Sequence, residues 1–172
     1  LMDSVDYDDN VPWPVASDGG GVSLAKSNQD SASREAANWV ASAQVGGTPG
    51  SRNLVPRHEP SPHLTGLMIN EVASSADERF RLEIVNASAT AIDLKGMVLA
   101  SSEAPAPEYM FSSQSLRPGE IIVLNETTIG FHPTDNERLF LYSPNKMFMV
   151  DAVRVDNAPR ARWPKRVRKV NC

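Results

Sequence analysis

Short apolar stretches separated by turn sequences follow one another along the chain after Gly66. They recur roughly every 8–14 residues, turn sequences such as NASAT, RPGE and SPNK separate them, and no long helical periodicity appears. This pattern predicts an all-β antiparallel sandwich or barrel across residues 67–155. The stretches are LMINEVAS, FRLEIVN, AIDLKGMVLAS, EYMFSS, GEIIVLN, ERLFLYS and MFMVDAVRV.

Alternation within these stretches predicts which side chains face the core. In FRLEIVN, Phe80, Leu82 and Ile84 share one face, because successive strand residues point to opposite sides. IIVL (121–124) and LFLY (139–142) are apolar throughout, which indicates central strands covered on both faces. The side chains predicted to be buried are Leu82, Ile84, Leu94, Leu99, Ile122, Leu124, Leu139 and Leu141.

Residues 1–53 have a different composition, rich in Gly, Ser, Asp and Asn. DSVDY (3–7) and GVSLAK (21–26) predict strands, the second a single edge strand. SASREAANWV (31–40) predicts a short helix with Ser31 or Ser33 as its N-cap. Three closely spaced prolines then predict an extended linker over residues 54–66, because proline fixes φ and lacks an N–H donor.

Charge is distributed unevenly over the 172 residues. The last thirteen residues hold six basic side chains and no acid, and the chain's formal charge is −4, so the remainder carries −10. An acidic body with a short basic tail at 165–172 does not match a nucleic-acid-binding domain, whose basic residues lie on the folded face. The tail by itself could touch nucleic acid, an anionic polymer or lipid headgroups; a solvated chain end is the favoured interpretation.

The start and the end of the chain share a sequence pattern. LMDSVDYDDNVPWP and FMVDAVRVDNAPRARWP both contain Asp, a small residue and Val, then Asp followed by Asp or Asn, then Trp-Pro. This similarity predicts that residues 1–53 are the tail of one module and that the body of the next module follows the linker. The chain would then be a piece of a tandem array.

Ordered motifs in residues 65–164 resemble the lamin-tail domain, which is an immunoglobulin-like β-sandwich. Five motifs occur in the order that the family has. They are an Asn-Glu pair in the first strand, a second strand ending in Glu-x-x-Asn, a following Asp-Leu-x-Gly strand, a Pro-Gly hairpin and a last hairpin ending in Asp-x-Val. Together they make a more specific match than any one of them. The matching residues include Asn70, Glu71, Glu83, Asn86, Ile92, Asp93, Leu94, Gly96 and Leu99, with LRPGEIIVL and ERLFLYSPNKMFMVDAVRV downstream.

Residues 1–53 resemble the trailing part of bacterial versions of the same domain. The second copy departs from that pattern, because KRVRKVNC stands after Trp163-Pro164 where a DGGGxSL strand would follow. The resemblance thus implies a body at 67–164 without its own tail. The matching positions in the first segment are Asp3, Val5, Tyr7, Trp13, Pro14, residues 19–21, Ser23, Leu24, Asn38, Trp39 and residues 48–53.

The resemblance implies a non-catalytic interaction, tethering or spacer module in a larger secreted or cell-envelope protein of bacteria. Heptad repeats, which precede the domain in animal lamins, do not occur here. The implied partner is another protein or a cell-surface polymer. The unmatched tail and body further predict that residues 1–53 pack on a lamin-tail body, within one chain or as a strand-swapped homodimer.

The alternative function is a carbohydrate- or calcium-binding accessory module. Asp6, Asp8 and Asn10 have the alternate spacing of a calcium loop, but Val11 stands where a turn glycine is needed and Ser17 where a bidentate Glu is needed. A solvated acidic turn is therefore favoured. Three tryptophans are the candidates for stacking on a sugar, with core packing as the favoured interpretation: Trp13, Trp39 and Trp163.

Catalytic signatures are weak, and we expect neither an enzyme nor a cofactor. Glu71 and Glu83 could suggest paired carboxylates, but both belong to the strand motifs of the body. No serine lies in a nucleophile motif, and the glycine-rich stretches lack the Lys-Ser/Thr of a phosphate loop. The single cysteine, Cys172, is terminal, and no apolar run is long enough to span a bilayer. The three histidines do not have the spacing of zinc ligands: His58, His63 and His132.

Overall fold

A computed structural model describes residues 4–51 and 66–157, and in these ranges the chain is almost entirely β. The only α-helix there is the four-residue α1 (Glu126–Ile129), capped by the Asn125 side chain, which accepts from the Thr128 N–H. Every strand pairing is antiparallel. No helix in the described ranges has the length and apolarity needed to cross a membrane.

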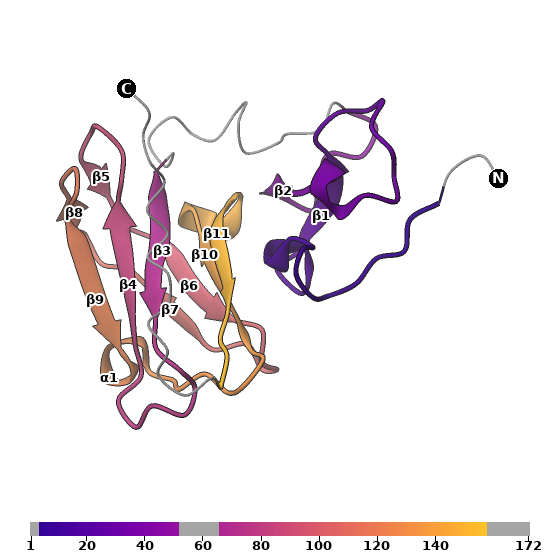
Figure 1. Cartoon of the computed structure of the whole chain (residues 1–172). Helices are drawn as coiled ribbons and strands as arrows, with labels where there is room; N and C mark the ends of the chain where they lie inside the picture. Colours follow the sequence, from indigo (N-terminus) through magenta and orange to yellow (C-terminus); the bar gives the residue numbers. More distant parts are fainter. Residues whose placement is uncertain (1–3, 52–65, 158–172) are drawn as a thin grey trace.

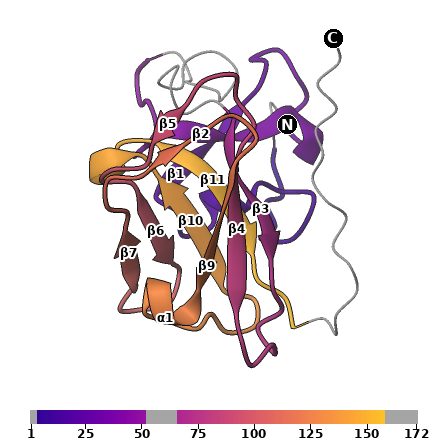
Figure 2. The ribbon, with the colours of Figure 1, turned by 90° about the vertical axis from the view of Figure 1, so that its left-hand side faces the viewer.

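Residues 66–157 form a sandwich of two sheets (Figures 1 and 2). One sheet has the order β3-β4-β9, the other the order β11-β10-β6-β7, and a short β5-β8 pair lies at one end. Hairpins join β3 to β4 and β10 to β11, while the chain crosses between the sheets after β4, β7 and β9, which is an immunoglobulin-like arrangement. The strands are β3 (Leu67–Val72), β4 (Arg81–Asn86), β5 (Ile92–Asp93), β6 (Val98–Ser101), β7 (Glu108–Met110), β8 (Ser115–Leu116), β9 (Ile121–Asn125), β10 (Arg138–Tyr142) and β11 (Met149–Arg154).

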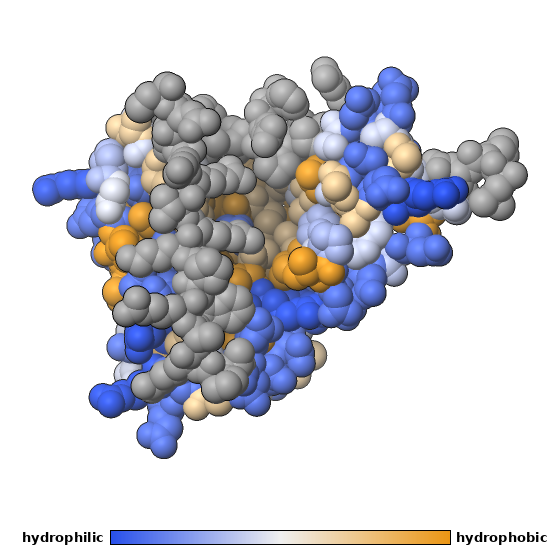
Figure 3. Space-filling model, viewed as in Figure 1, coloured by the Kyte–Doolittle hydropathy of each residue, from blue (hydrophilic) through white to orange (hydrophobic). Residues whose placement is uncertain are grey.

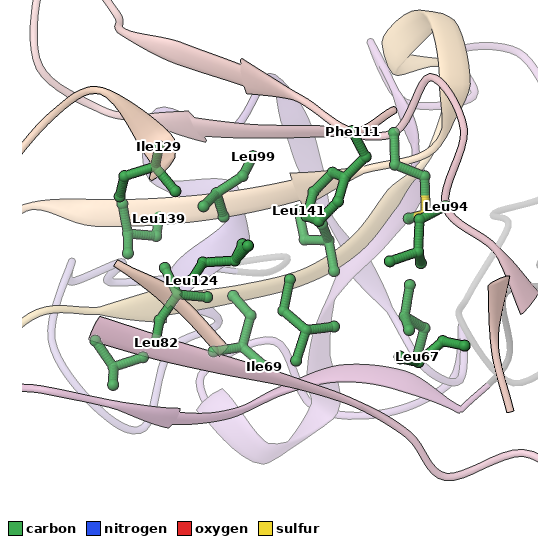
Figure 4. Close-up of a cluster of buried hydrophobic side chains, with 14 of the residues drawn as sticks. Leu67, Ile69, Leu82, Leu94, Leu99, Phe111, Leu124, Ile129, Leu139 and Leu141 are labelled. Carbon is green, nitrogen blue, oxygen red and sulfur yellow. The ribbon is translucent and has the colours of Figure 1, made fainter. Parts of the chain in front are cut away.

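The core lies between the two sheets (Figure 4). Leu82 pairs with Val72 on one side and Leu124 on the other, so that alternate residues of all three strands enter the core together. The prediction for this core is confirmed for seven of eight side chains, which are at most 1% exposed; Ile122 is only partly buried. The seven are Leu82, Ile84, Leu94, Leu99, Leu124, Leu139 and Leu141.

The two uniformly apolar strands have different environments. LFLY is central, as predicted, because β10 lies between β11 and β6 and is covered on both faces. The prediction is wrong for IIVL, because β9 is the edge of its sheet, with Ile121 46% and Val123 56% exposed. Local apolarity cannot show whether another part of the chain covers the outer face of a strand.

Residues 4–51 form a separate hairpin of β1 (Val22–Lys26) and β2 (Trp39–Val45), with two short 3-10 turns, η1 (Val15–Ser17) and η2 (Ala36–Asn38). The predicted strand at 21–26 is confirmed as β1. The helix predicted over 31–40 is wrong: only η2 is helical, and Trp39 begins a strand that pairs with β1. Cross-strand pairing outweighs the weak helical propensity of this Ser- and Asn-containing stretch.

The strand predicted at 3–7 is also wrong where it can be checked, because residues 4–7 are irregular. Three predicted features lie outside the described residues: most of the linker at 54–66, the basic tail at 165–172, and Trp163.

Candidate docking face

The outer face of the β11-β10-β6-β7 sheet carries a second apolar cluster, on the side away from the main core. Along β10, Leu139 and Leu141 point into the main core, so Phe140 and Tyr142 point outward. Small residues flank Phe140, since Ala152 and Ala100 are its partners on β11 and β6. The buried members are Val98, Ala100, Phe140 and Tyr142, with Val45, Met149 and Ala152 packed against them.

The N-terminal segment, residues 4–51, covers this face (Figure 1). The turn at residues 18–21 lies against the face, and Gly19 and Gly21 in it have positive φ values of 86° and 72°. A Cβ on Gly20 would lie 2.7 Å from Met149 Cε and 3.1 Å from a Phe140 ring carbon. The SDGGG sequence therefore lets backbone lie directly against the aromatic ring of the sheet.

Tyr142 fixes the position of this turn. Its hydroxyl donates to the Gly20 carbonyl at 2.9 Å in a buried environment. Burial, with a smaller effect from the Glu108 carboxylate, raises the pKa of Tyr142 to about 12, so the hydroxyl stays protonated as a donor. Lys146 lies 5.7 Å from the Tyr142 ring centre and forms an ion pair with Glu108 beside it.

Backbone pairing adds a second attachment. The Val45 N–H donates to the Met147 carbonyl at 3.0 Å, and Gln44 forms a β-bridge with Phe148. Strand β2 is thereby joined to the residues just before β11, and η3 (Pro144–Lys146) shapes that connection.

Two arginines form a third attachment. Arg138 and Arg154 are directly opposite each other on β10 and β11. Arg138 forms an ion pair with Asp18 and lies 3.4 Å from an Asp9 carboxylate oxygen. Arg154 donates to the Asn10 side-chain oxygen at 3.0 Å and to the Asp9 backbone oxygen. The sheet thus presents positive charge where the segment presents an acidic turn.

The calcium candidates belong to this attachment. Asp8 Oδ1 accepts from the backbone and side-chain amides of Asn10 at 3.0 and 2.8 Å, and the backbone bond is the main cause of the lowered pKa of Asp8. The Asn10 side-chain oxygen faces Arg154, so it meets a cationic donor, and Asp6 is exposed. Within residues 4–51 and 66–157, no group of three or more His, Cys, Asp or Glu side chains is placed to hold a metal ion.

The tryptophans of the segment pack on one another. Trp13 is 9% exposed, its ring centre lies 6.5 Å from that of Trp39, and Tyr7 meets it edge-on at 5.3 Å. Trp39 donates from Nε1 to the Ser33 carbonyl at 2.7 Å, and the Lys26 ammonium lies 5.8 Å from its ring centre. These contacts build a small internal core for the segment, and no flat, exposed stacking platform results from Trp13.

The remaining chemical candidates lie in two separate places, one on the outer face of the β3-β4-β9 sheet and one near α1. Glu71 and Glu83 are opposite each other on β3 and β4, on the outer face of the other sheet, where Glu83 accepts from the Asn70 side-chain amide at 2.9 Å. His132 contacts Glu126 and the Ser75 carbonyl near α1. His58 and His63 lie outside the described residues.

The residues that form the docking face give little signal in the sequence. Phe140 and Tyr142 belong to a strand that is apolar throughout, and this pattern predicts that something covers its outer face without showing what does so. Arg138 and Arg154 gave no signal, because an arginine at the end of an apolar strand is usually solvated.

These features define an immunoglobulin-like β-sandwich that holds a segment of its own chain on one sheet. No protein-family model matches the chain, and no curated protein matches it. Among solved structures, the chain is similar to the archaellum periplasmic stator protein complex FlaF and FlaG from Sulfolobus acidocaldarius, at 16% identity and a TM-score of 0.36. That similarity covers 60% of this chain and 97% of the other.

Proposed function

We propose that this chain is a non-catalytic, immunoglobulin-like interaction module that grips an acidic, glycine-rich segment on one sheet face. The docking face carries this proposal. It combines an apolar cluster, a buried tyrosine donor and a pair of arginines, and each of the three meets a matching feature in residues 4–51. Such a combination gives specificity as well as affinity, because a segment lacking any one feature would leave buried groups unpaired.

The module would work as a tether or spacer in a larger protein. If residues 1–53 are the tail of one lamin-tail copy, their docking on the body at 67–164 joins consecutive copies through a folded contact. The ordered motifs of the sequence support membership of the lamin-tail family. They also support a bacterial, secreted or cell-envelope location, with another protein or a surface polymer as partner.

A cleavage experiment on the full chain tests whether the N-terminal segment stays bound to the docking face. A specific protease site placed between residues 54 and 64 would be cut after folding, and the two pieces analysed by size exclusion. We expect them to elute together, because Tyr142, Arg138 and the apolar cluster hold them without the covalent link. Separation of the wild-type pieces at micromolar concentration would contradict the proposal.

A matched pair of variants shows whether the described face does the holding. Arg138→Glu would place a carboxylate against Asp18 and should release the segment after cleavage. Arg81→Glu makes the same charge change on an exposed position of the other sheet and should leave the pieces associated. If both variants behave alike, the contact does not depend on this face.

A further inference from the structure

The four edge strands of the sandwich differ in how they are protected. Unpaired edge strands can pair with other chains, and proteins usually block them with charge, proline, bulges or a covering segment. The edges here are β3 and β9 in one sheet and β11 and β7 in the other.

Three of the edges are blocked. On β3, the Asp151 carboxylate accepts from the Ile69 N–H at 2.9 Å. On β11, strand β2 covers the residues just before the strand, where the Val45 N–H donates to the Met147 carbonyl. Strand β7 has only three residues, and its Glu108 is ion-paired with Lys146.

Strand β9 has none of these protections. It reads Ile-Ile-Val-Leu-Asn, without charge or proline, and it pairs with β4 in regular register from Ile121 to Asn125. No other strand of the described chain pairs with it. Ile121 and Val123 are 46% and 56% exposed.

The pairing pattern shows which backbone groups of β9 are free. The Asn86 N–H donates to the Glu120 carbonyl, and the Glu126 N–H donates to the Phe80 carbonyl, at the two ends of the ladder. Antiparallel pairs alternate between hydrogen-bonded and non-hydrogen-bonded. The N–H and C=O groups of Ile122 and Leu124 therefore bond to β4, and those of Ile121 and Val123 point to the open edge.

One row of the adjoining sheet face is apolar, while the row through Val123 carries Glu83 and Glu71 on the neighbouring strands. Met68, Val85 and Ile121 are in register across β3, β4 and β9, and they form one row on the outer side. Figure 3 shows apolar surface beside hydrophilic surface on the side of the sandwich where β9 lies. An added strand would extend this row.

We propose that β9 pairs with β9 of a second copy of this chain, antiparallel about a two-fold axis at Val123. In that register Val123 meets Val123 of the other copy, and Ile121 meets Asn125, so no charge opposes a like charge. The free N–H and C=O groups of one strand find partners in the other. The two three-stranded sheets become one continuous sheet, with the apolar rows on the same side.

Light scattering and sedimentation on the full chain, from about 1 μM to a few hundred μM, test this pairing. We expect a monomer–dimer equilibrium that Val123→Lys and Val123→Glu each weaken at least tenfold, because like charges then meet at the axis. An equimolar mixture of the two variants should restore dimers. Met110→Lys also places a lysine on an edge strand, at a 68% exposed position on β7, and it should leave the dimer intact.

Four results would overturn the proposal: a wild-type monomer at the highest concentration, open-ended aggregates, a dimer unaffected by Val123→Lys, or no recovery in the mixture. A dimer lost on Arg138→Glu but not on Val123→Lys would point to exchange of residues 4–51 and would overturn it too. Ile121→Lys serves as a second variant if Val123→Lys alters the circular dichroism of the fold.

Discussion

The Tyr142 hydroxyl and the Gly20 carbonyl, 122 positions apart in the chain, form a buried hydrogen bond of 2.9 Å. Tyr142 comes from the central strand of the sandwich, and Gly20 from the glycine turn of the N-terminal segment. This bond therefore links the two parts where the glycine turn of the segment lies against the Phe140 ring.

Tyr142→Phe should lower the free energy of unfolding by about 1–3 kcal/mol, because the buried Gly20 carbonyl would lose its donor. Urea unfolding measures the change. Tyr109→Phe is the matched control, since Tyr109 packs beside the main core with no hydrogen bond from its hydroxyl among the described contacts, and it should change stability by less than about 0.5 kcal/mol. Equal effects for the two variants would show that the bond to Gly20 contributes nothing specific.

The Arg138–Asp18 ion pair predicts a charge-reversal pattern. Arg138→Asp should destabilise the chain by about 1–3 kcal/mol, since two carboxylates would then meet at a partly buried site. Asp18→Arg combined with Arg138→Asp should recover part of the loss. Thermal unfolding of the two single variants and the double variant gives the coupling energy. Additive losses would mean that the two side chains do not interact.

Leu124→Ala should cost about 2–5 kcal/mol of stability, because Leu124 is 1% exposed and its removal leaves a cavity among packed strands. Denaturant unfolding with an unchanged m-value checks this. Gln114→Ala, at an exposed position whose described hydrogen bond uses the backbone oxygen, should be nearly neutral. A loss below about 1 kcal/mol for Leu124→Ala would place it outside a tightly packed core.

Period-two alternation was sufficient to predict the all-β class and the inward faces of the body. Leu82 and Ile84 are buried for the reason the pattern gives, which is local to their strand. The environment of β9 could not be predicted in this way, because exposure of Val123 depends on whether a distant segment covers the strand. The two-residue strand β8 was missed because two residues carry no periodicity.

The docking face shows the same limit. A glycine cluster such as residues 19–21 is typical of a turn, but only the three-dimensional arrangement shows that Gly20 lies against Phe140. Trp39 was assigned to a helix because the stretch before it has a capping serine, and pairing with β1 determined the outcome instead. The acidic turn suggested calcium from spacing alone, whereas Arg154 occupies the Asn10 side-chain oxygen.

His132 predicts how stability depends on pH. Its Nε2 lies 3.0 Å from the Ser75 carbonyl and its Nδ1 lies 2.6 Å from a Glu126 carboxylate oxygen. Only the imidazolium can donate to both acceptors, and these contacts raise the pKa of His132, the Ser75 carbonyl most and Glu126 next, while burial opposes them.

The pKa is higher in the folded than in the unfolded chain, so the stabilisation is complete below the unfolded value of about 6.5 and is lost as pH rises through the folded value. The stability difference between wild type and His132→Gln should therefore be larger at about pH 5.5 than at about pH 8.5. In an NMR titration, Glu126→Gln should lower the pKa of His132 without removing the whole upward shift, because the Ser75 carbonyl remains. The signal that disappears in His132→Gln assigns the resonance. A His132 pKa at or below about 6.5 in the wild type, or a stability difference that grows with pH, would contradict the double contact.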